Sequence, residues 1–400
     1  MRVFQVLYLI LFIGLYLFIT YTAYKSTTRI VRVSAYRNII RIFIAAMTIL
    51  MLSAFIVLYI WPLNPRNATG YNYHLIFNAL LSIDFVAKLP PALAYIAGLF
   101  LTARKKHVAY FMGLILSISI SISILYGTLA GSKELHINYI DIKIKDLPSE
   151  FDNYRIAQIS DLHLGSFINS KTLVEEVRKE ITTIDADIIL FTGDLVNNFS
   201  DETESCKSAF QTMTRNHDCY SILGNHDYGN YTDWNDARKK TENFLQIVDA
   251  HQKFGFKILN NENAKIVRGN DSIYIAGVEN WGHPPFPQYA NLEKALAGIP
   301  SGSFTILLSH DPAHWDDVIK KRNDIRLTLS GHTHGLQWGI SRAGFRFSLS
   351  YLSRNQWSGL YQFGDNYLNV NVGLGMVAIP WRINMPAEIS VITLKRIEID

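Results

Sequence analysis

Ser221-Ile222-Leu223-Gly224-Asn225-His226-Asp227 passes from a short apolar strand directly into an amide, an imidazole and a carboxylate. Polar side chains after a buried strand have to be solvated, paired or bound to an ion, because an unpaired polar group in an apolar interior is costly. Open α/β sheets place their functional sites at the carboxyl ends of parallel strands. The segment therefore predicts a sheet strand that delivers several polar groups to one site.

Four more polar blocks follow apolar runs in the same way. The blocks are Asp161-Leu162-His163 after 155–160, Gly193-Asp194 after 188–192, His310 after 304–309, and Gly331-His332-Thr333-His334 after 325–330. Helical spacing at Lys171–Ile184, with Ser170 as its N-cap, and near Asp201–Thr214 separates the first three strands. This order predicts an α/β fold whose parallel strands bring distant residues around one point.

The blocks supply the side chains that a pair of divalent metals needs. Carboxylates combined with imidazoles suit Mn, Fe or Zn better than Ca or Mg. Asp161 and His163 are two residues apart, as are His332 and His334, and on an extended segment such side chains face the same way. Because a carboxylate has two oxygens, we expect Asp194 to bridge two cations.

The remaining members of the blocks have other expected roles. Asn225 offers a neutral oxygen ligand, which limits the charge of the site. His226 then stays free as a proton donor, and we expect Asp227 to hold its other ring nitrogen. Each block alone also has a structural explanation, such as a surface loop, a turn or a packed histidine. The joint occurrence of all five blocks in this order favours a metal site.

This ordered set of motifs resembles the calcineurin-like metallophosphoesterase superfamily over about residues 150–395. The resemblance implies a four-layer α-β-β-α sandwich that holds two divalent metal ions. The implied ligands of one metal are Asp161, His163, Asp194 and His334, and those of the other are Asp194, Asn225, His310 and His332. The tail from Gly359 to Arg382 is similar to the bacterial membrane- or envelope-associated branch. Leu336 departs from that branch, which usually has a second Gly there.

Such a site favours hydrolysis of phosphoesters by a hydroxide that the two metals activate. Two divalent cations outweigh two carboxylates and a hydroxide, so the site attracts a phosphodiester anion. His226 would protonate the leaving alkoxide, with no covalent protein intermediate. We expect a phosphodiester rather than a dianionic monoester, because no obvious basic cluster accompanies the motifs.

The first third of the chain is of a different kind. Four long apolar stretches lie at 3–24, 39–61, 75–101 and 108–130, each near or above the roughly 20 residues that cross a bilayer as a helix. The sequence therefore predicts a membrane domain over residues 1–132 and a catalytic domain over residues 133–400. Only Arg2 precedes the first stretch and no small-residue cleavage site follows it, so we expect a retained helix rather than a cleaved signal.

The charge of the chain is divided between these two parts. Residues 1–132 hold eleven basic residues and one acid, Asp84, while the whole chain has a net charge of +4, so the rest is acidic. We therefore expect no nucleic-acid partner. Basic residues fill the first loop (25–41) and the third (104–106), whereas the second has only Arg66. By the positive-inside rule, the catalytic domain and the N-terminus lie outside the cytoplasm.

Three details of the chain carry their own expectations. Asp84 and Lys88 are placed at i,i+4 to pair on one helix face, and the third stretch is expected to cross the membrane rather than lie in the interface. Alternating serines at 117–123 would suit a strand, but an isolated strand cannot satisfy its backbone in lipid, so a helix is predicted. Cys206 and Cys219, the only cysteines, are equally consistent with a disulfide and with two separate thiols.

The resulting prediction is a membrane-anchored metallophosphoesterase that acts on a lipid or envelope phosphoester. One alternative is hydrolysis of a lipid-linked pyrophosphate such as UDP-diacylglucosamine, a step of lipid A synthesis. That substrate is cytoplasmic, and the predicted topology opposes it. Another alternative is a membrane receptor or scaffold that keeps the metal fold for structure, although such a protein has no need of a free proton donor.

Overall fold

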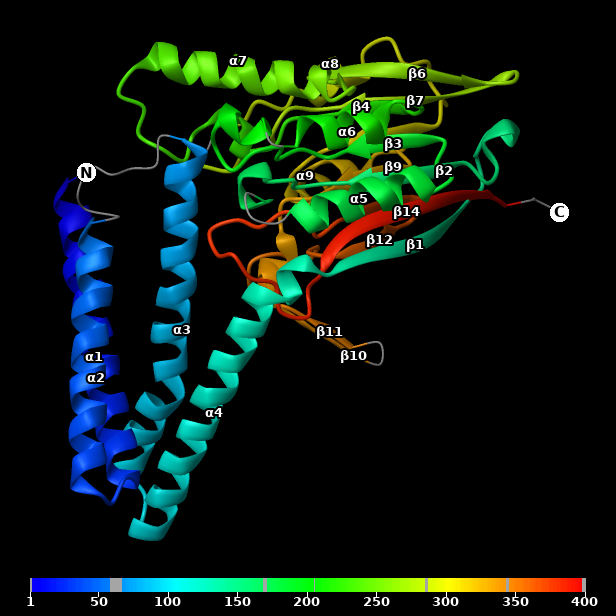
Figure 1. The fold of residues 1–400 in the computed structure, drawn as a ribbon. Coiled ribbons are helices and arrows are strands. Elements are labelled where there is room, and N and C mark those ends of the chain that lie inside the picture. Colours follow the sequence, from blue (N-terminus) through cyan, green and yellow to red (C-terminus); the bar gives the residue numbers. More distant parts are fainter. Residues whose placement is uncertain are drawn as a thin grey trace. The chain divides into compact units, whose positions relative to one another are not determined.

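The computed structural model describes residues 2–57, 67–167, 171–204, 206–284, 287–342 and 345–397 (Figure 1). These residues form two compact units. One consists mainly of residues 1–64 and 73–129, and the other mainly of residues 130–377 and 382–400. The domain boundary predicted between residues 132 and 133 stays a prediction. The proposed N-cap of the helix at 171, Ser170, lies outside the described residues.

The N-terminal unit is built from four long helices. They are α1 (Arg2–Ile30), α2 (Ser34–Phe55), α3 (Ala68–Gly98) and α4 (Ala103–Leu129). The spans long and apolar enough to cross a membrane are Leu9–Ile30, Ser34–Phe55, Ala68–Gly98 and Ala103–Lys133. The prediction of four membrane-spanning helices is confirmed in the length and the apolar composition of the helices.

The serine-rich fourth stretch is a helix, as predicted. The hydroxyl of Ser121 donates to the carbonyl of Ser117 at 2.9 Å, and that of Ser123 donates to the carbonyl of Ser119 at 2.9 Å. Each hydroxyl therefore bonds inside its own helix, one turn back. This pairing lets the polar residues occupy an apolar helix without leaving their hydroxyls unpaired.

The charged pair of the third helix is formed. Lys88 Nζ lies 2.7 Å from Asp84 Oδ2, and the Tyr16 hydroxyl of α1 donates to the same oxygen at 2.6 Å. Lys88 also donates to the Tyr16 hydroxyl at 3.3 Å. The side chains of Lys88 and Asp84 are only 14% and 9% exposed, so the pair joins α1 to α3 inside the bundle.

The larger unit contains two six-stranded sheets. The first has the order β1-β14-β2-β3-β4-β5. Its strands are β1 (Leu135–Ile144), β2 (Arg155–Ile159), β3 (Ile188–Phe191), β4 (Asp218–Ser221), β5 (Lys257–Ile258) and β14 (Ala387–Arg396). Strands β2 to β5 are parallel, and β14 runs antiparallel to β2. The carboxyl ends of β2, β3 and β4 therefore meet at one edge of the sheet.

The second sheet has the order β12-β13-β9-β8-β7-β6. Its strands are β6 (Glu262–Arg268), β7 (Asp271–Gly277), β8 (Thr305–Leu308), β9 (Leu327–Ser330), β12 (Gly359–Phe363) and β13 (Asn366–Val370). The central strands β7, β8, β9 and β13 are parallel, and antiparallel β6 and β12 close the edges. A separate hairpin joins β10 (Ile340–Arg342) to β11 (Phe345–Phe347).

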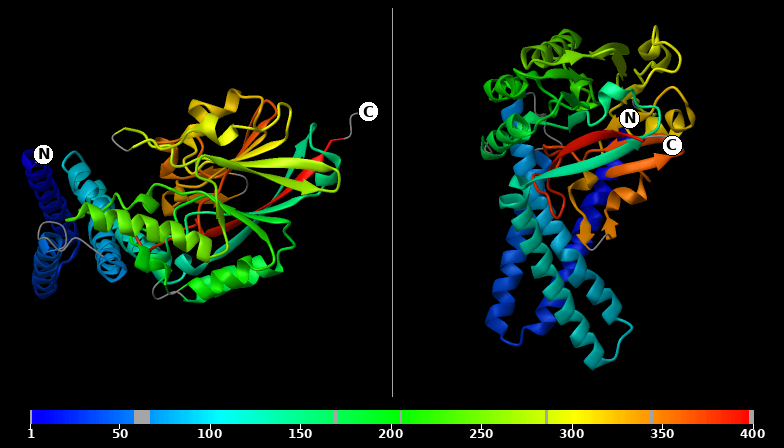
Figure 2. Two further views of the ribbon diagram at one scale, coloured as in Figure 1. Left: turned by 90° about the horizontal axis from the view of Figure 1, so that it is seen from above. Right: turned by 90° about the vertical axis from the view of Figure 1, so that its right-hand side faces the viewer.

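Helices cover the outer face of each sheet, which gives four layers (Figures 1 and 2). On the first sheet these are α5 (Lys171–Thr183), α6 (Lys207–Thr214) and α7 (Ala237–Lys253), and on the second α8 (Leu292–Leu296) and α9 (Ala313–Asp317). The inner faces share one apolar core, in which Ile156 and Leu190 of the first sheet pack with Ile275 and Leu308 of the second. The predicted α-β-β-α sandwich is confirmed.

Short 3₁₀ turns connect these elements. They are η2 (Gly131–Lys133), η3 (Ser149–Phe151), η4 (Leu164–Phe167), η5 (Ser200–Thr203), η6 (His226–Tyr228), η7 (Ile319–Lys321), η8 (His334–Gln337) and η9 (Leu349–Leu352). The helix expected near Asp201–Thr214 is divided into η5 and α6. The strand expected at 221–223 is β4, which ends at Ser221. Cys206 and Cys219 are both buried and are not joined by a disulfide, so they are two separate thiols in this structure.

The pair in the helical unit predicts a non-additive effect on stability. Asp84→Leu should leave Lys88 without its counter-ion and lower the free energy of unfolding of the helical unit by roughly 3 kcal/mol. The double variant Asp84→Leu/Lys88→Met should recover most of this loss, because both charges are then removed. Thermal unfolding of the full chain in detergent measures both effects. Additive losses would contradict a stabilising pair.

Candidate metal centre

The predicted site residues all follow strand ends. Asp161 comes two residues after β2, Asp194 three after β3, and Asn225 four after β4, in the first sheet. His310 follows β8 and His332 follows β9 in the second sheet. The site is therefore assembled where the carboxyl ends of both sheets converge.

The backbone at these positions is not extended. Positive φ angles occur at Asp161 (49°), His163 (39°), Asp194 (60°), His332 (73°) and His334 (49°). Residues other than glycine rarely adopt such angles, and a cluster of them indicates a functional constraint. The sequence analysis expected the side chains at i and i+2 to face the same way because the segment is extended. The side chains do converge, but the segment is not extended, so the stated reason is wrong. Left-handed turns direct the side chains inward instead.

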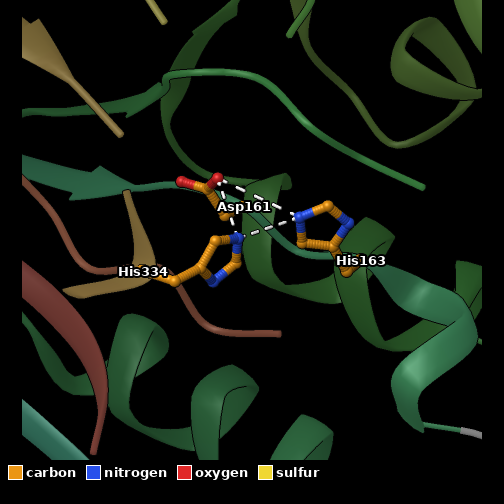
Figure 3. Close-up of side chains that lie close together, drawn as sticks. All are labelled: Asp161, His163 and His334. Atoms are coloured by element: carbon orange, nitrogen blue, oxygen red, sulfur yellow. Dashed lines mark hydrogen bonds and ion pairs between the residues drawn. The ribbon is translucent and has the colours of Figure 1, made fainter. Parts of the chain in front are cut away.

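Asp161, His163 and His334 form the first group (Figure 3). His334 Nε2 lies 3.2 Å from Asp161 Oδ1 and 3.0 Å from His163 Nε2. The other oxygen of Asp161 accepts the Ser160 hydroxyl at 2.5 Å and the His332 backbone N–H at 3.0 Å. The backbone N–H of His332 also lies 3.1 Å from Oδ1, the oxygen that faces the imidazoles, so protein donors hold both oxygens in place.

Asp194, His310 and His332 form the second group, with Asn225 beside it. Asn225 Oδ1 lies 3.0 Å from His310 Nε2 and 2.7 Å from His332 Nδ1. His332 Nδ1 and His310 Nε2 are 3.2 Å apart. An amide oxygen, a carboxylate and two ring nitrogens therefore converge, and these are the four ligands expected for the second metal.

Asp194 lies between the two groups. Its Oδ2 is 3.6 Å from His163 Nε2 of the first group and 3.2 Å from His310 Nε2 of the second. Its Oδ1 accepts the backbone N–H of His226 at 2.8 Å. A single oxygen therefore faces both groups, as a ligand that bridges two cations would.

Backbone carbonyls decide which ring nitrogen is free. His163 Nδ1 lies 3.1 Å from the carbonyl of Val196, and His310 Nδ1 lies 2.8 Å from the carbonyl of Thr192. A carbonyl accepts only from N–H, so in a neutral ring Nε2 carries a lone pair. A hydrogen bond from the ring nitrogen that does not bind the metal orients metal-binding histidines in general. Both Nε2 lone pairs then point at the Asp194 oxygen.

The electrostatics of the site match this geometry. Burial opposes ionisation of Asp194, but the neighbouring His310 and His226 outweigh it and hold its pKa well below the usual range. Burial, with Arg354 among the neighbouring charges, lowers the pKa of His332 to about 4. For His310, burial works against protonation, yet in the absence of a metal Asp194 raises its pKa to about 10, so a proton on Nε2 takes the place that a cation would occupy. The buried Asp194 carboxylate therefore stays ionised only with positive charge beside it.

The donor set fits divalent metal ions. Imidazole lone pairs and carboxylate oxygens that converge on one point repel each other unless a cation lies between them. The side chains of Asp161, His163, Asp194 and His310 are at most 2% exposed, so bulk water does not screen this repulsion. Nitrogen and oxygen donors in this mixture suit Mn, Fe or Zn.

The expected pairing of Asp227 with His226 is not formed. His226 Nδ1 lies 2.6 Å from the carbonyl of Asn197 instead. The Asp227 carboxylate accepts backbone N–H groups of Asp194 at 3.0 Å, Leu195 at 2.8 Å and Gly224 at 2.9 Å. This corrects the predicted role: Asp227 fastens the two ligand-bearing loops together, and Asn197 orients the imidazole. The pattern of side chains could not predict a backbone acceptor.

Tyr231 is a residue that the sequence analysis missed. Its ring stacks on His226 at 4.2 Å between centroids, and its hydroxyl accepts the Asn225 side-chain N–H at 2.7 Å. This bond leaves Asn225 Oδ1 directed at the two histidines. The position of Tyr231, four residues after the motif, was the only signal available in the sequence.

Arg354 was missed as well. It pairs with Asp311 at 2.5 and 3.1 Å, and its guanidinium lies 3.3 Å from His332 Nε2. The sequence analysis expected no obvious basic cluster near the motifs, and Arg354 is a single basic group beside the site. Because Asp311 neutralises Arg354, the pair adds little net positive charge to the site.

Comparison with known proteins agrees with this geometry. The model of the calcineurin-like phosphoesterase family matches residues 154–336. The chain is 31% identical to the metallophosphoesterase YkuE of Bacillus subtilis, over 64% of this chain and 83% of that protein. It is 28% identical to a transmembrane protein with metallophosphoesterase domain of Danio rerio, over 68% of this chain. The alignment spans 60% of that relative's length.

A further relative has a named substrate. The chain is 27% identical to the UDP-2,3-diacylglucosamine pyrophosphatase LpxG of Chlamydia trachomatis, over 58% of this chain and 81% of that protein. The chain belongs to the calcineurin-like phosphoesterase family. Its four long helices are apolar enough to cross a membrane, and the relatives it is similar to include a transmembrane protein and a named pyrophosphatase, which agrees with the sequence prediction.

The site predicts that ligand and proton-donor variants differ in metal binding. Asn225→Ala and His332→Ala should each weaken Mn²⁺ binding at least about tenfold, since each removes a converging donor. His226→Ala should keep the Mn²⁺ affinity and slow turnover by about 10²–10⁴. Titration calorimetry on the full chain in detergent measures the affinities. His226 also lies close to His163 and Asp194, so loss of metal from His226→Ala would make it a ligand.

Proposed function

We propose that this chain is a membrane-anchored, metal-dependent phosphodiesterase with two metal positions. The observation that carries the proposal is the place of Asp194, whose Oδ2 faces His163 and His310 at 3.6 and 3.2 Å. One metal would be held by Asp161, His163, Asp194 and His334. The other would be held by Asp194, Asn225, His310 and His332. Two bound cations would supply a hydroxide nucleophile near neutral pH and neutralise charge on the phosphoryl oxygens.

His226 is the proposed proton donor. The Asn197 carbonyl accepts from its Nδ1–H at 2.6 Å, which leaves Nε2 to carry a proton toward the leaving alkoxide. The stacked ring of Tyr231 restricts the imidazole to one orientation. Asp227 acts indirectly. Its carboxylate accepts the backbone N–H groups of Gly224 and Asp194, and so fixes the position of the His226 loop relative to the proposed bridging ligand Asp194.

A monoanionic diester suits the charge of the site better than a dianionic monoester. Arg354, whose guanidinium lies 3.3 Å from His332 Nε2, is already paired with Asp311. The site therefore offers the cations and one proton donor, and the guanidinium beside His332 is already neutralised by a carboxylate, which leaves little positive charge for a second phosphate charge. Esters of lipids or of envelope polymers are the proposed substrates.

The proposed placement follows from charge. Residues 1–132 form the proposed membrane domain and residues 133–400 the catalytic domain. The first and third loops of the helical unit carry the basic clusters, so we place them in the cytoplasm and the catalytic domain outside it. Substrates on the outer side of the membrane would then be the accessible ones.

A second candidate is hydrolysis of a lipid-linked pyrophosphate. The relative LpxG is named for UDP-2,3-diacylglucosamine, and its match spans 81% of its length. The same donors would serve this reaction, because it also breaks a P–O bond. A cytoplasmic catalytic domain would favour this candidate, so the orientation test below separates the two. A receptor or scaffold that retains the metal fold is the remaining alternative.

The proposed activity predicts a preference between two chromogenic substrates. The full chain in detergent with Mn²⁺ should hydrolyse bis(4-nitrophenyl) phosphate with a kcat/KM at least about tenfold higher than for 4-nitrophenyl phosphate, equivalent to about 1.4 kcal/mol. EDTA should abolish the activity and Mn²⁺ restore it. His283→Ala, whose side chain is 47% exposed, serves as the matched control for His226→Ala. Bound metal without hydrolysis under Mn, Fe and Zn would favour the scaffold.

The proposed orientation predicts the behaviour of reporter fusions. Alkaline phosphatase fused after Ala130 should be active, because that enzyme matures only outside the cytoplasm, whereas the same reporter after Val33 should be inactive. Green fluorescent protein at the two positions should give the reverse pattern. Fluorescence after Ala130 would place the catalytic domain in the cytoplasm and favour the pyrophosphate substrate.

A further inference from the structure

The turn that follows His334 keeps a leucine in an unfavourable backbone conformation. Positive φ angles continue from His334 (49°) through Gly335 (55°) and Leu336 (49°) to Gln337 (56°). Glycine adopts such angles freely, whereas a γ-branched residue does so at a cost. Leu336 is nevertheless 50% exposed, so it does not compensate for this cost by filling the core. A strained backbone that presents an apolar side chain to the surface calls for a function.

Hydrogen bonds fix this turn on both sides. The Ser348 hydroxyl donates to the Gly335 carbonyl at 2.5 Å, and the Ile383 backbone N–H donates to the Gln337 carbonyl at 2.9 Å. Gln337 Oε1 accepts the Val377 N–H at 2.7 Å. Leu336 is therefore held outward by the fold rather than exposed by a loose end.

The neighbouring turn adds more apolar surface. Ser348 connects η8 to η9, and η9 exposes Leu349 (47%), Tyr351 (58%) and Leu352 (79%). We call Leu336, Leu349, Tyr351 and Leu352 the apolar rim. Leu336 is two residues from the candidate ligand His334. The apolar rim therefore begins at the border of the metal centre.

We propose that the apolar rim binds an acyl chain of a phosphoester lipid whose phosphate lies in the metal centre. This inference rests on the proposed function and names its substrate class. The occupant follows from the rest of the chain: four helices can cross a bilayer, and only η2, three residues long, joins the last of them to β1. Lipid is thus the apolar ligand present at the highest local concentration. Burying a leucine side chain against an acyl chain is favourable by roughly tenfold in affinity or more.

The test varies the chain length of one substrate. Phosphatidyl-4-nitrophenol with two 16-carbon chains and with two 4-carbon chains, in the same detergent, present the same scissile bond to the full chain with Mn²⁺. The wild-type protein should favour the long-chain substrate in kcat/KM. Leu352→Ser and Leu336→Gly should each reduce the ratio of long-chain to short-chain kcat/KM about tenfold. Leu245→Ser, which removes a 59% exposed leucine from α7, should leave both values unchanged.

A second measurement separates a binding role from a structural one. Leu336→Gly relaxes the left-handed backbone, so its melting temperature should be no lower than that of the wild type while its lipid preference falls. If both substrates are hydrolysed and the ratio is unchanged in both variants, the apolar rim does not bind the acyl chain. If neither substrate is hydrolysed although metal is bound, the proposed function itself fails, and this inference fails with it.

Discussion

The carboxylate of Asp194 has to remain ionised in an interior that excludes water, and the site is arranged around that requirement. Its Oδ1 receives the His226 backbone N–H, while its Oδ2 faces His163 and His310. An isolated buried charge is too costly to keep, so the surroundings must provide cations or shed the charge. The backbone carbonyls of Val196 and Thr192 accept from Nδ1 and so turn Nε2 of His163 and His310 toward Asp194, where each nitrogen is available to a metal ion. A metal resolves the repulsion that this arrangement creates.

The donors of the site come from both sheets, and neither sheet supplies all of them. The first sheet delivers Asp161, Asp194 and Asn225, and the second delivers His310 and His332. The apolar core between the inner faces fixes the distance between these two sets. The Asp227 carboxylate links the two ligand-bearing loops of the first sheet, because it accepts hydrogen bonds from backbone N–H groups of both loops. Rigidity at the strand ends is therefore the source of the precision of the site.

The cost of placing a group in an unfavourable solvent also applies to the membrane helices and to the surface of the larger unit. Asp84 and Lys88 neutralise each other within the bundle, because a lone charge in lipid is costly. The apolar rim is the opposite case, an apolar surface in a place where water would be expected. Both features support the proposal of a membrane-anchored enzyme for a lipid phosphoester, in which the short turn η2 follows α4 in the chain.

The sequence predicted the strands, the four long helices and the seven proposed ligands, because each depends on a local pattern. An apolar run ending in a polar block indicates a strand and a site whatever the rest of the chain does. The left-handed backbone at Asp161 and His163, the Asn197 partner of His226 and the Arg354–Asp311 pair were not predictable in this way. They depend on which backbone atoms and distant side chains come within hydrogen-bonding distance. By itself the sequence determined the family, the kinds of donor and the membrane segment, while only the tertiary structure decided which atom of each donor faces the site, because that choice is made by contacts between residues far apart in the chain.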